Sequence, residues 1–351
     1  MKVFADLHHT ALYYSLQLLF EKRLGWELYR PAGIDWFEQG YWNLYPGVHK
    51  NTADQYLTLN QCFKRDVHGF LLPKRMKLND NYRIEDGIYY IFDPSSAKVH
   101  RGITLEKFRN TKFDILISSV PSHIPIWNQL IADYQPQAKH IFQVGNAWGH
   151  CPGVKNILVS TEPFQVPGNV NACFYHQEFD LNVFKYVPPT NSKKVYSYIH
   201  YMREMELHHV FRQQLEPSGW EFFTYGAGME GDLCLQNNIA EKYNEMGWLW
   251  QVKPEGDGFG HGLFNSYACG RPAIIKANYY QGKLGGHLLQ DQKTCLDISR
   301  YSVHEASNLL NIFAQPEHHL RMCEAAHNRF KEVVDFDKEF IKIKKFLENL
   351  L

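Results

Sequence analysis

The segment from Gln251 to Ile275 constrains the fold of this 351-residue chain more than any other. Its two ends are strand-like. Between them lie a polar turn with glycines at 256, 258, 260 and 262 and a short run at 263–269 that predicts a helix. Gly270 and Pro272 are typical of residues just beyond a helix C-terminus. Glycine allows positive φ and close approach of the backbone to a ligand. Because a helix N-terminus presents free N–H groups and partial positive charge, this turn predicts an anion site, most often for a phosphate.

Strand-like and helix-like segments alternate along the rest of the chain. The first part predicts strands at 3–6, 26–30, 114–118, 140–144 and 156–160, with helices at 10–24 and 125–134. The second part predicts strands at 195–200, 220–225, 248–252, 273–276 and 294–298, and helices at 205–215, 238–244, 303–313, 318–334 and 338–351. This βαβ alternation predicts an α/β fold with mostly parallel sheets covered by helices.

The proline- and polar-rich segment 187–192 has the composition of a domain boundary. We therefore expect an N-terminal Rossmann-like domain at 1–187, with an aromatic-rich insertion at about 36–112. A C-terminal Rossmann-like domain is expected at 188–330. The amphipathic end of the chain, 331–351, is expected to pack back across the hinge.

Charge and cysteine content narrow the classes of function. Lys plus Arg and Asp plus Glu number 37 each, so the formal net charge is zero and gives no global attraction to nucleic acid or an anionic membrane. Seven cysteines without a C-x-x-C pair indicate reduced thiols. The sequence contains no signal peptide and no apolar stretch long enough to span a bilayer, so we expect a cytoplasmic protein.

The stretch Asp257-Gly258-Phe259-Gly260, followed by Asn265-Ser266-Tyr267-Ala268-Cys269-Gly270-Arg271-Pro272, resembles the nucleotide-sugar motif E-G-F-G-x4-E-A-x-A-x-G-x-P of retaining GT-B glycosyltransferases. In that family the first acid lies near the sugar and the second holds the ribose hydroxyls. Asp257 and Asn265 occupy these two positions. Asparagine keeps a hydrogen-bonding group but removes the charge.

The resemblance implies a GT-B fold, in which two Rossmann-like domains face each other across a cleft and a C-terminal helix pair ends the chain. It makes 1–187 the acceptor domain and 188–330 the nucleotide-sugar donor domain. It implies an enzyme that transfers a sugar from a nucleotide-sugar, UDP- or GDP-linked, to a hydroxyl of a carbohydrate or other acceptor. Retention and metal independence are expected, with no cofactor and no metal site. The only D-x-D, Asp335-Phe336-Asp337, is interpreted as helix capping.

Candidate site residues follow from the motif and from the ends of predicted strands. Donor-binding candidates are Arg203, Lys253, Gly258, Phe259, Gly260, His261, Asn265 and Lys283, in which the three cations would hold the diphosphate. Catalytic candidates are Asp257, Glu255, His8 and His9; a histidine can act as a general base near neutral pH. Acceptor-binding candidates are Asn146 and His150. For each charged residue, the alternative is a solvated surface group.

Three other functions stay open. A nucleotide-sugar epimerase of the same fold would keep the donor turn. A DNA glycosyltransferase of phage type, acting on hydroxymethylated bases, would need a basic groove and a flipped base. A non-catalytic nucleotide-sugar-binding protein would bind without turnover. The sequence leaves open the donor base, the sugar, the acceptor and the oligomeric state.

Overall fold

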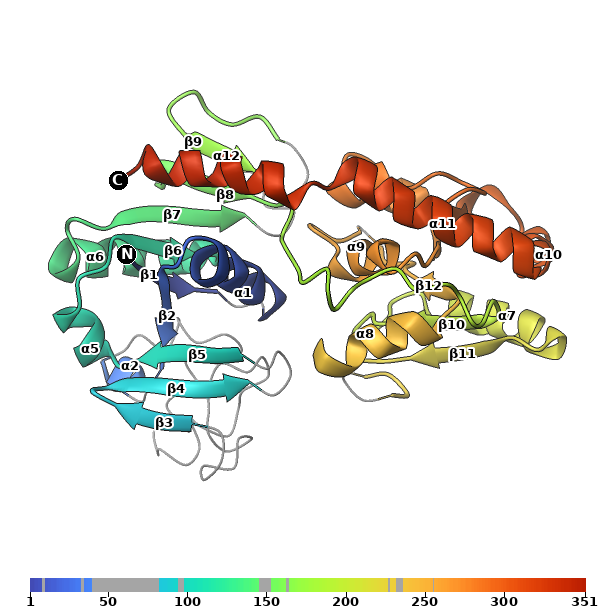
Figure 1. The fold of residues 1–351 in the computed structure, drawn as a ribbon, viewed down its shortest axis with the longest axis horizontal. Coiled ribbons are helices and arrows are strands. Elements are labelled where there is room, and N and C mark those ends of the chain that lie inside the picture. The colour runs from blue at the N-terminus through green and yellow to red at the C-terminus, as the bar shows by residue number, and fades with distance from the viewer. Residues whose placement is uncertain are drawn as a thin grey trace. The chain divides into compact units, whose positions relative to one another are not determined.

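The computed structural model describes residues 1–7, 10–32, 35–39, 82–93, 98–144, 153–161, 164–226, 228–231, 236–254 and 256–351. The chain divides into two compact units (Figure 1). Unit 1 comprises Met1–Val159, Phe164–Glu178 and Glu339–Leu351, and unit 2 comprises Ser160–Pro163 and Phe179–Lys338. The proline-rich segment 187–192 lies inside unit 2, and most of the terminal helix belongs to unit 1.

Unit 1 is built on a sheet that has the strand order β3-β4-β5-β2-β1-β6-β7-β8-β9 within the described residues. The strands are β1 (Lys2–Asp6), β2 (Glu27–Pro31), β3 (Tyr82–Glu85), β4 (Ile88–Asp93), β5 (Lys98–Ile103), β6 (Ile115–Ser118), β7 (Lys139–Val144), β8 (Asn156–Val159) and β9 (Asn171–Phe174). β4 pairs antiparallel with β3 and β5, and the other pairs are parallel. The described part of the aromatic-rich stretch 36–112 therefore extends the sheet beyond β2.

Helices cover both faces of this sheet. They are α1 (Thr10–Gln17), which continues as the π-helix η1 (Leu18–Arg23), α2 (Asp35–Glu38), α5 (Leu105–Asn110), the 3-10 turn η3 (Pro121–His123), α6 (Ile124–Tyr134) and the C-terminal α12 (Phe336–Glu348). Leu16 of α1 and Leu347 of α12 lie in one core with β1 and β6. On the other face the Phe4 ring contacts Trp36, Phe108 and Trp127.

Unit 2 has a parallel sheet with the order β11-β10-β12-β13-β14 within the described residues. Its strands are β10 (Lys194–Ser197), β11 (Glu221–Thr224), β12 (Trp248–Trp250), β13 (Ala273–Ile275) and β14 (Cys295–Asp297). The residues of β12 are completely buried, as expected for a central parallel strand covered on both faces.

The helices of unit 2 are α7 (Met205–Leu215), α8 (Gln236–Glu245), α9 (His261–Ala268), α10 (Val303–Phe313) and α11 (Pro316–Val333), with short 3-10 turns such as η5 (Ala277–Tyr280). Residues 263–268 of α9 are buried, and His327 of α11 contacts the Ala268 carbonyl at 2.9 Å. Asp335 accepts a hydrogen bond from the Lys338 backbone N–H at 3.0 Å, which confirms its interpretation as a helix cap. In the part of the chain that the structure describes, every helix is too short or too polar to cross a lipid bilayer.

Candidate functional site

The glycine-rich turn begins at the carboxyl end of β12, the middle strand of the unit 2 sheet. Gln251 Nε2 donates a 2.7 Å hydrogen bond to Asp257 Oδ2, and Lys253 Nζ forms an ion pair with Asp257 Oδ1. The Gly256 N–H donates to the Lys253 carbonyl at 2.9 Å and closes the turn. The Asp257 side chain is 17% exposed and that of Lys253 is 42% exposed. The carboxylate is therefore fixed in place, while the lysine side chain stays accessible.

A second segment forms a wall beside this turn. Gly256 has a φ of 64°, and a Cβ added to it would lie 2.4 Å from the Tyr279 carbonyl oxygen and 3.2 Å from Lys283 Cδ. The Tyr280 hydroxyl donates to the Gln251 carbonyl at 3.3 Å. The chain 277–283 therefore packs directly against the turn, and it brings Lys283 next to Gly256.

Helix α9 starts at the end of the turn. Gly260 has a φ of 79° at the N-cap, and its carbonyl accepts from the Leu263 and Phe264 N–H groups. The Phe259 ring is buried, stacked on Phe264 with ring centroids 4.4 Å apart, and His261 lies against its edge at 4.8 Å. Phe259 therefore anchors the turn to the core, and Gly258 and Gly260 on either side of it are buried as well.

Asn265 lies one turn further along α9. It is 8% exposed, and its side-chain Oδ1 has no hydrogen-bond partner among the described residues. Buried polar atoms in folded proteins nearly always have a partner, and an unpaired one costs about 1–3 kcal/mol. This acceptor beside the glycine-rich turn is therefore free to accept a hydrogen bond from a ligand hydroxyl.

The loop after β10 carries two charged residues, Arg203 and Glu204. Of these, only Arg203 was predicted from the sequence as a site residue. Arg203 is exposed. Its neighbour Glu204 pairs with Lys276, with 2.6 Å between Oε2 and Nζ, and accepts a hydrogen bond from the Tyr279 hydroxyl. Lys276 follows β13 directly, so its position at a strand's carboxyl end was the signal that could have identified it.

Unit 1 has a buried polar cluster at the carboxyl end of β1. Asp6 is 2% exposed, and its Oδ2 lies 2.8 Å from His123 Nδ1 and 2.7 Å from Trp127 Nε1. His123 is 5% exposed. An Nδ1–H that donates to the carboxylate leaves Nε2 as an acceptor. Neither Asp6 nor His123 is among the candidates predicted from the sequence, although Asp6 ends the first strand.

Five of the candidates selected from the sequence lie outside the described residues: His8, His9, Asn146, His150 and Glu255. In the sequence, His8 and His9 come two and three residues after Asp6. Among the described residues, no three His, Cys, Asp or Glu side chains gather as they would around a metal ion.

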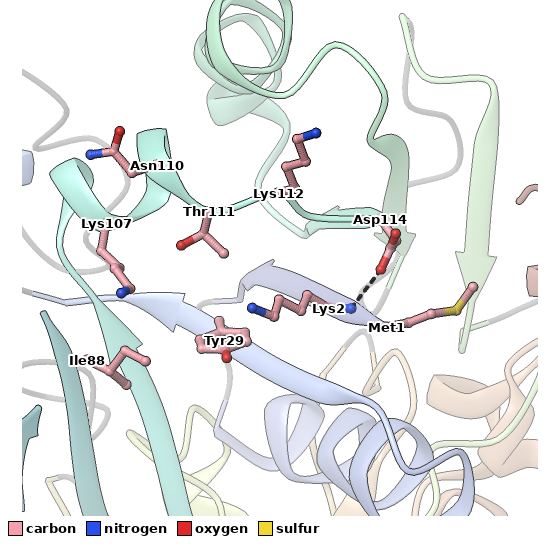
Figure 2. Close-up of a pocket in the computed structure, with 9 residues that line it drawn as sticks. All are labelled: Met1, Lys2, Tyr29, Ile88, Lys107, Asn110, Thr111, Lys112 and Asp114. Atoms are coloured by element: carbon pink, nitrogen blue, oxygen red, sulfur yellow. Dashed lines mark hydrogen bonds between the residues drawn. The ribbon is translucent and has the colours of Figure 1, made fainter. Parts of the chain in front are cut away.

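A pocket of about 590 Å³ in unit 1 lies at the opposite edge of the sheet (Figure 2). Lys2 and Asp114 line it at the amino ends of β1 and β6, and the Lys2 N–H donates to Asp114 Oδ2 at 2.8 Å. In Figure 2, the Lys2 and Lys107 side chains extend toward the middle of the pocket, and Lys112 points away. Ligands of open α/β sheets bind outside the carboxyl ends of strands, so we assign neither donor nor acceptor to this pocket.

The fold recurs in solved glycosyltransferase structures, although the sequence matches no known family model and no curated protein. Anabaena Alr3699/HepE in complex with UDP and glucose has a TM-score of 0.59 at 10% identity, covering 99% of each chain. The pneumococcal O-GlcNAc transferase GtfA, in complex with UDP and GlcNAc, has a TM-score of 0.56 at 10% identity and covers 100% of this chain and 99% of its own. An α-glucosyltransferase in complex with UDP and a 13-mer DNA has a TM-score of 0.59 at 10% identity, covering 99% of each chain. The fold class predicted from the sequence, α/β of the GT-B type, is confirmed.

Proposed function

We propose that this protein is a glycosyltransferase that moves a sugar from a nucleotide-sugar to an acceptor hydroxyl. The observation that carries the proposal is the fixed arrangement of Gln251, Lys253 and Asp257 ahead of α9, at the carboxyl edge of the unit 2 sheet. The three solved structures described above share the fold, and each holds UDP. A nucleoside diphosphate is the class of anion that such a helix start suits.

The reaction needs two kinds of stabilisation. The sugar develops oxocarbenium character, and the departing nucleoside diphosphate gains negative charge. Lys253, Lys283 and Arg203 are the proposed diphosphate cations, together with the N–H groups at the start of α9; donors aimed at developing charge are worth about 2.7–4 kcal/mol each. Asp257 would accept hydrogen bonds from the sugar hydroxyls, and Asn265 Oδ1 would accept one from the ribose.

Unit 1 would supply the groups that bind the acceptor. His123 Nε2, with its ring oriented by Asp6, would accept a hydrogen bond or a proton from a hydroxyl group. His8, His9, Asn146 and His150 remain proposed contacts on this unit, and Glu255 remains the second carboxylate candidate on unit 2. The motif resemblance supports retention of anomeric configuration and a reaction without a metal ion.

The test is a calorimetric titration of the whole chain with UDP, GDP, ADP and CMP, with and without EDTA, followed by assays with the matching sugar nucleotides. We expect one of these nucleotides to bind selectively, with the same affinity in the presence of EDTA. We also expect the matching sugar nucleotide to be hydrolysed slowly when no acceptor is present. Absence of binding by every nucleotide would contradict the proposal.

The reaction products separate the alternatives. An epimerase would convert the sugar nucleotide without releasing the nucleoside diphosphate, and a binding protein would leave it intact. Acceptor assays should include simple saccharides and a duplex with hydroxymethylated cytosine, because the solved structures of this fold include one that holds DNA. An NMR spectrum of the product gives the anomeric configuration and decides between retention and inversion.

A further inference from the structure

An ion pair crosses the carboxyl end of β12 in unit 2. Glu204 lies in the loop after β10, and Lys276 is the first residue after β13. In the sheet β12 lies between these two strands. The 2.6 Å contact between Lys276 Nζ and Glu204 Oε2 therefore spans the strand that leads into the donor turn.

Tyr279 connects this ion pair to the donor turn. Its hydroxyl donates to Glu204 Oε1. Its carbonyl oxygen lies 2.4 Å from the position that a Cβ on Gly256 would take. One residue thus contacts both the ion pair and the turn that holds Asp257. Lys276 is thus linked through Tyr279 to Gly256, the residue that Lys283 also contacts.

The hydrogen-bonding capacity of Lys276 is only partly used. A lysine ammonium has three N–H donors. Among the described residues, one goes to Glu204 and a second to the Tyr279 hydroxyl at 3.4 Å, which leaves one for an oxygen of a ligand. Burial alone lowers the pKa of Lys276, but the hydrogen bonds with Glu204 and Tyr279 outweigh it and raise the pKa above its usual value. Lys276 is therefore a cation at neutral pH.

We propose that Lys276 is a further cation for the diphosphate of the donor, held in position by Glu204 and Tyr279. This inference rests on the proposed function. The side chains of Lys276 and Glu204 are 24% and 20% exposed. At such sites desolvation offsets much of the attraction within an ion pair, so stability is a weak reason for the pair to be there. The Glu204 carboxylate orients the ammonium and also repels a diphosphate.

These opposed roles give a sharp test by calorimetry with UDP and uridine. Lys276→Met keeps the length of the side chain and removes its charge, so we expect UDP to bind roughly 10- to 100-fold more weakly and uridine to bind as it does to the wild type. Glu204→Gln keeps a hydrogen-bond acceptor for Lys276 and removes the repulsion, so UDP should bind as tightly as to the wild type or tighter. Lys293→Met is the matched control. Lys293 is an exposed lysine just before β14, at the amino end of that strand, so its replacement should change neither affinity.

Unchanged UDP affinity in Lys276→Met would overturn the inference, as would an equal loss for UDP and uridine. Should Lys276→Met fail to fold, Lys276→Gln, which can still bond to Glu204, carries the same expectation and the same contrary outcomes. The affinity of the wild-type protein for UDP distinguishes failure of this inference from failure of the proposed function. If the wild type binds UDP and Lys276 variants bind it equally well, only the role of Lys276 is lost. If the wild type binds no nucleotide, the proposed function is contradicted and the inference falls with it.

Discussion

The environment of Asp257 suits a carboxylate that binds a ligand better than it suits a solvated surface group. Gln251 and Lys253 contact its two carboxylate oxygens, and it is mostly buried in the turn between β12 and α9. Fixing a carboxylate in this way loses side-chain entropy. The gain comes when a ligand meets an acceptor that is already oriented.

Replacing Asp257 by Asn tests this role. The amide keeps the shape and removes the charge, so we expect the rate of sugar transfer or donor hydrolysis to fall about 100-fold or more. UDP affinity should stay within a few-fold of the wild type, because the sugar is absent from UDP. Steady-state kinetics and calorimetry measure the two effects. Asp335→Asn, which alters an exposed helix cap, is the control. Wild-type kinetics in Asp257→Asn would remove it from the site.

Asp6 makes a different prediction, about stability. Its carboxylate is the acceptor for two buried donors, His123 Nδ1–H and Trp127 Nε1–H. Asp6→Ala leaves both without a partner, and each costs about 1–3 kcal/mol. We expect the free energy of unfolding to fall by roughly 2–5 kcal/mol in urea titrations. Asp133→Ala, in an exposed hydrogen bond with Gln129, should cost less than about 0.5 kcal/mol. Equal small losses would show that the cluster is not strongly coupled.

At the scale of elements, the donor turn and Lys283 could be predicted from sequence, and the packing of the segment 277–283 against the turn could not. The turn and α9 are local, because glycine positions and the helix stop are visible within about 20 residues. The contact of Gly256 with Tyr279 and the pair of Glu204 with Lys276 join segments that only the parallel sheet brings together. Asp6 and His123 are likewise far apart in sequence. The sequence predicts residues at strand ends one at a time. Which of them contact each other depends on the order of the strands in the sheet.

The wall gives a prediction for Gly256. A methyl group there would lie 2.4 Å from the Tyr279 carbonyl, so Gly256→Ala should displace the segment 277–283 and with it Lys283. We expect weaker UDP binding, by about tenfold for the loss of one charged contact. Gly282→Ala is the matched control. It has a positive φ of 76° and no atom within 4 Å of its added Cβ, so it introduces backbone strain without a clash. Equal effects of the two variants on UDP affinity would contradict the role of the wall.

At the scale of the whole molecule, the βαβ alternation predicted the fold class, and the partition of the chain came from long-range packing. The terminal helix joins unit 1, because Ile343, Phe346 and Leu347 are buried in a core with α1, β1 and β6. Its amphipathic pattern predicts a helix with one buried face but leaves open which core that face joins. The strands β3 and β4 lie in a stretch whose aromatics and turns obscured their alternation.

The two units also share a response to acid. Burial lowers the pKa of His140 in unit 1, and of His208 and His319 in unit 2, from 6.5 to about 4. Between these values the unfolded chain binds protons that the folded chain does not, so the free energy of unfolding falls as the pH falls from 6.5 toward 4. Each histidine contributes up to about 3 kcal/mol to this loss.

His208 is the position at which this prediction can be checked. Its ring packs between Phe222 and Trp250, and neither ring nitrogen has a partner among the described residues. His208→Leu should therefore raise the stability of the protein at pH 8 by about 1 kcal/mol or more and by a larger amount at pH 5, where the wild type has lost part of its stability. Phe222→Leu removes a ring from the same cluster but no titrating group, so its destabilisation should be alike at both pH values. Urea titrations of the three proteins at pH 8 and pH 5 measure the difference. If the gain from His208→Leu is the same at both pH values, His208 does not contribute to the acid sensitivity of unit 2.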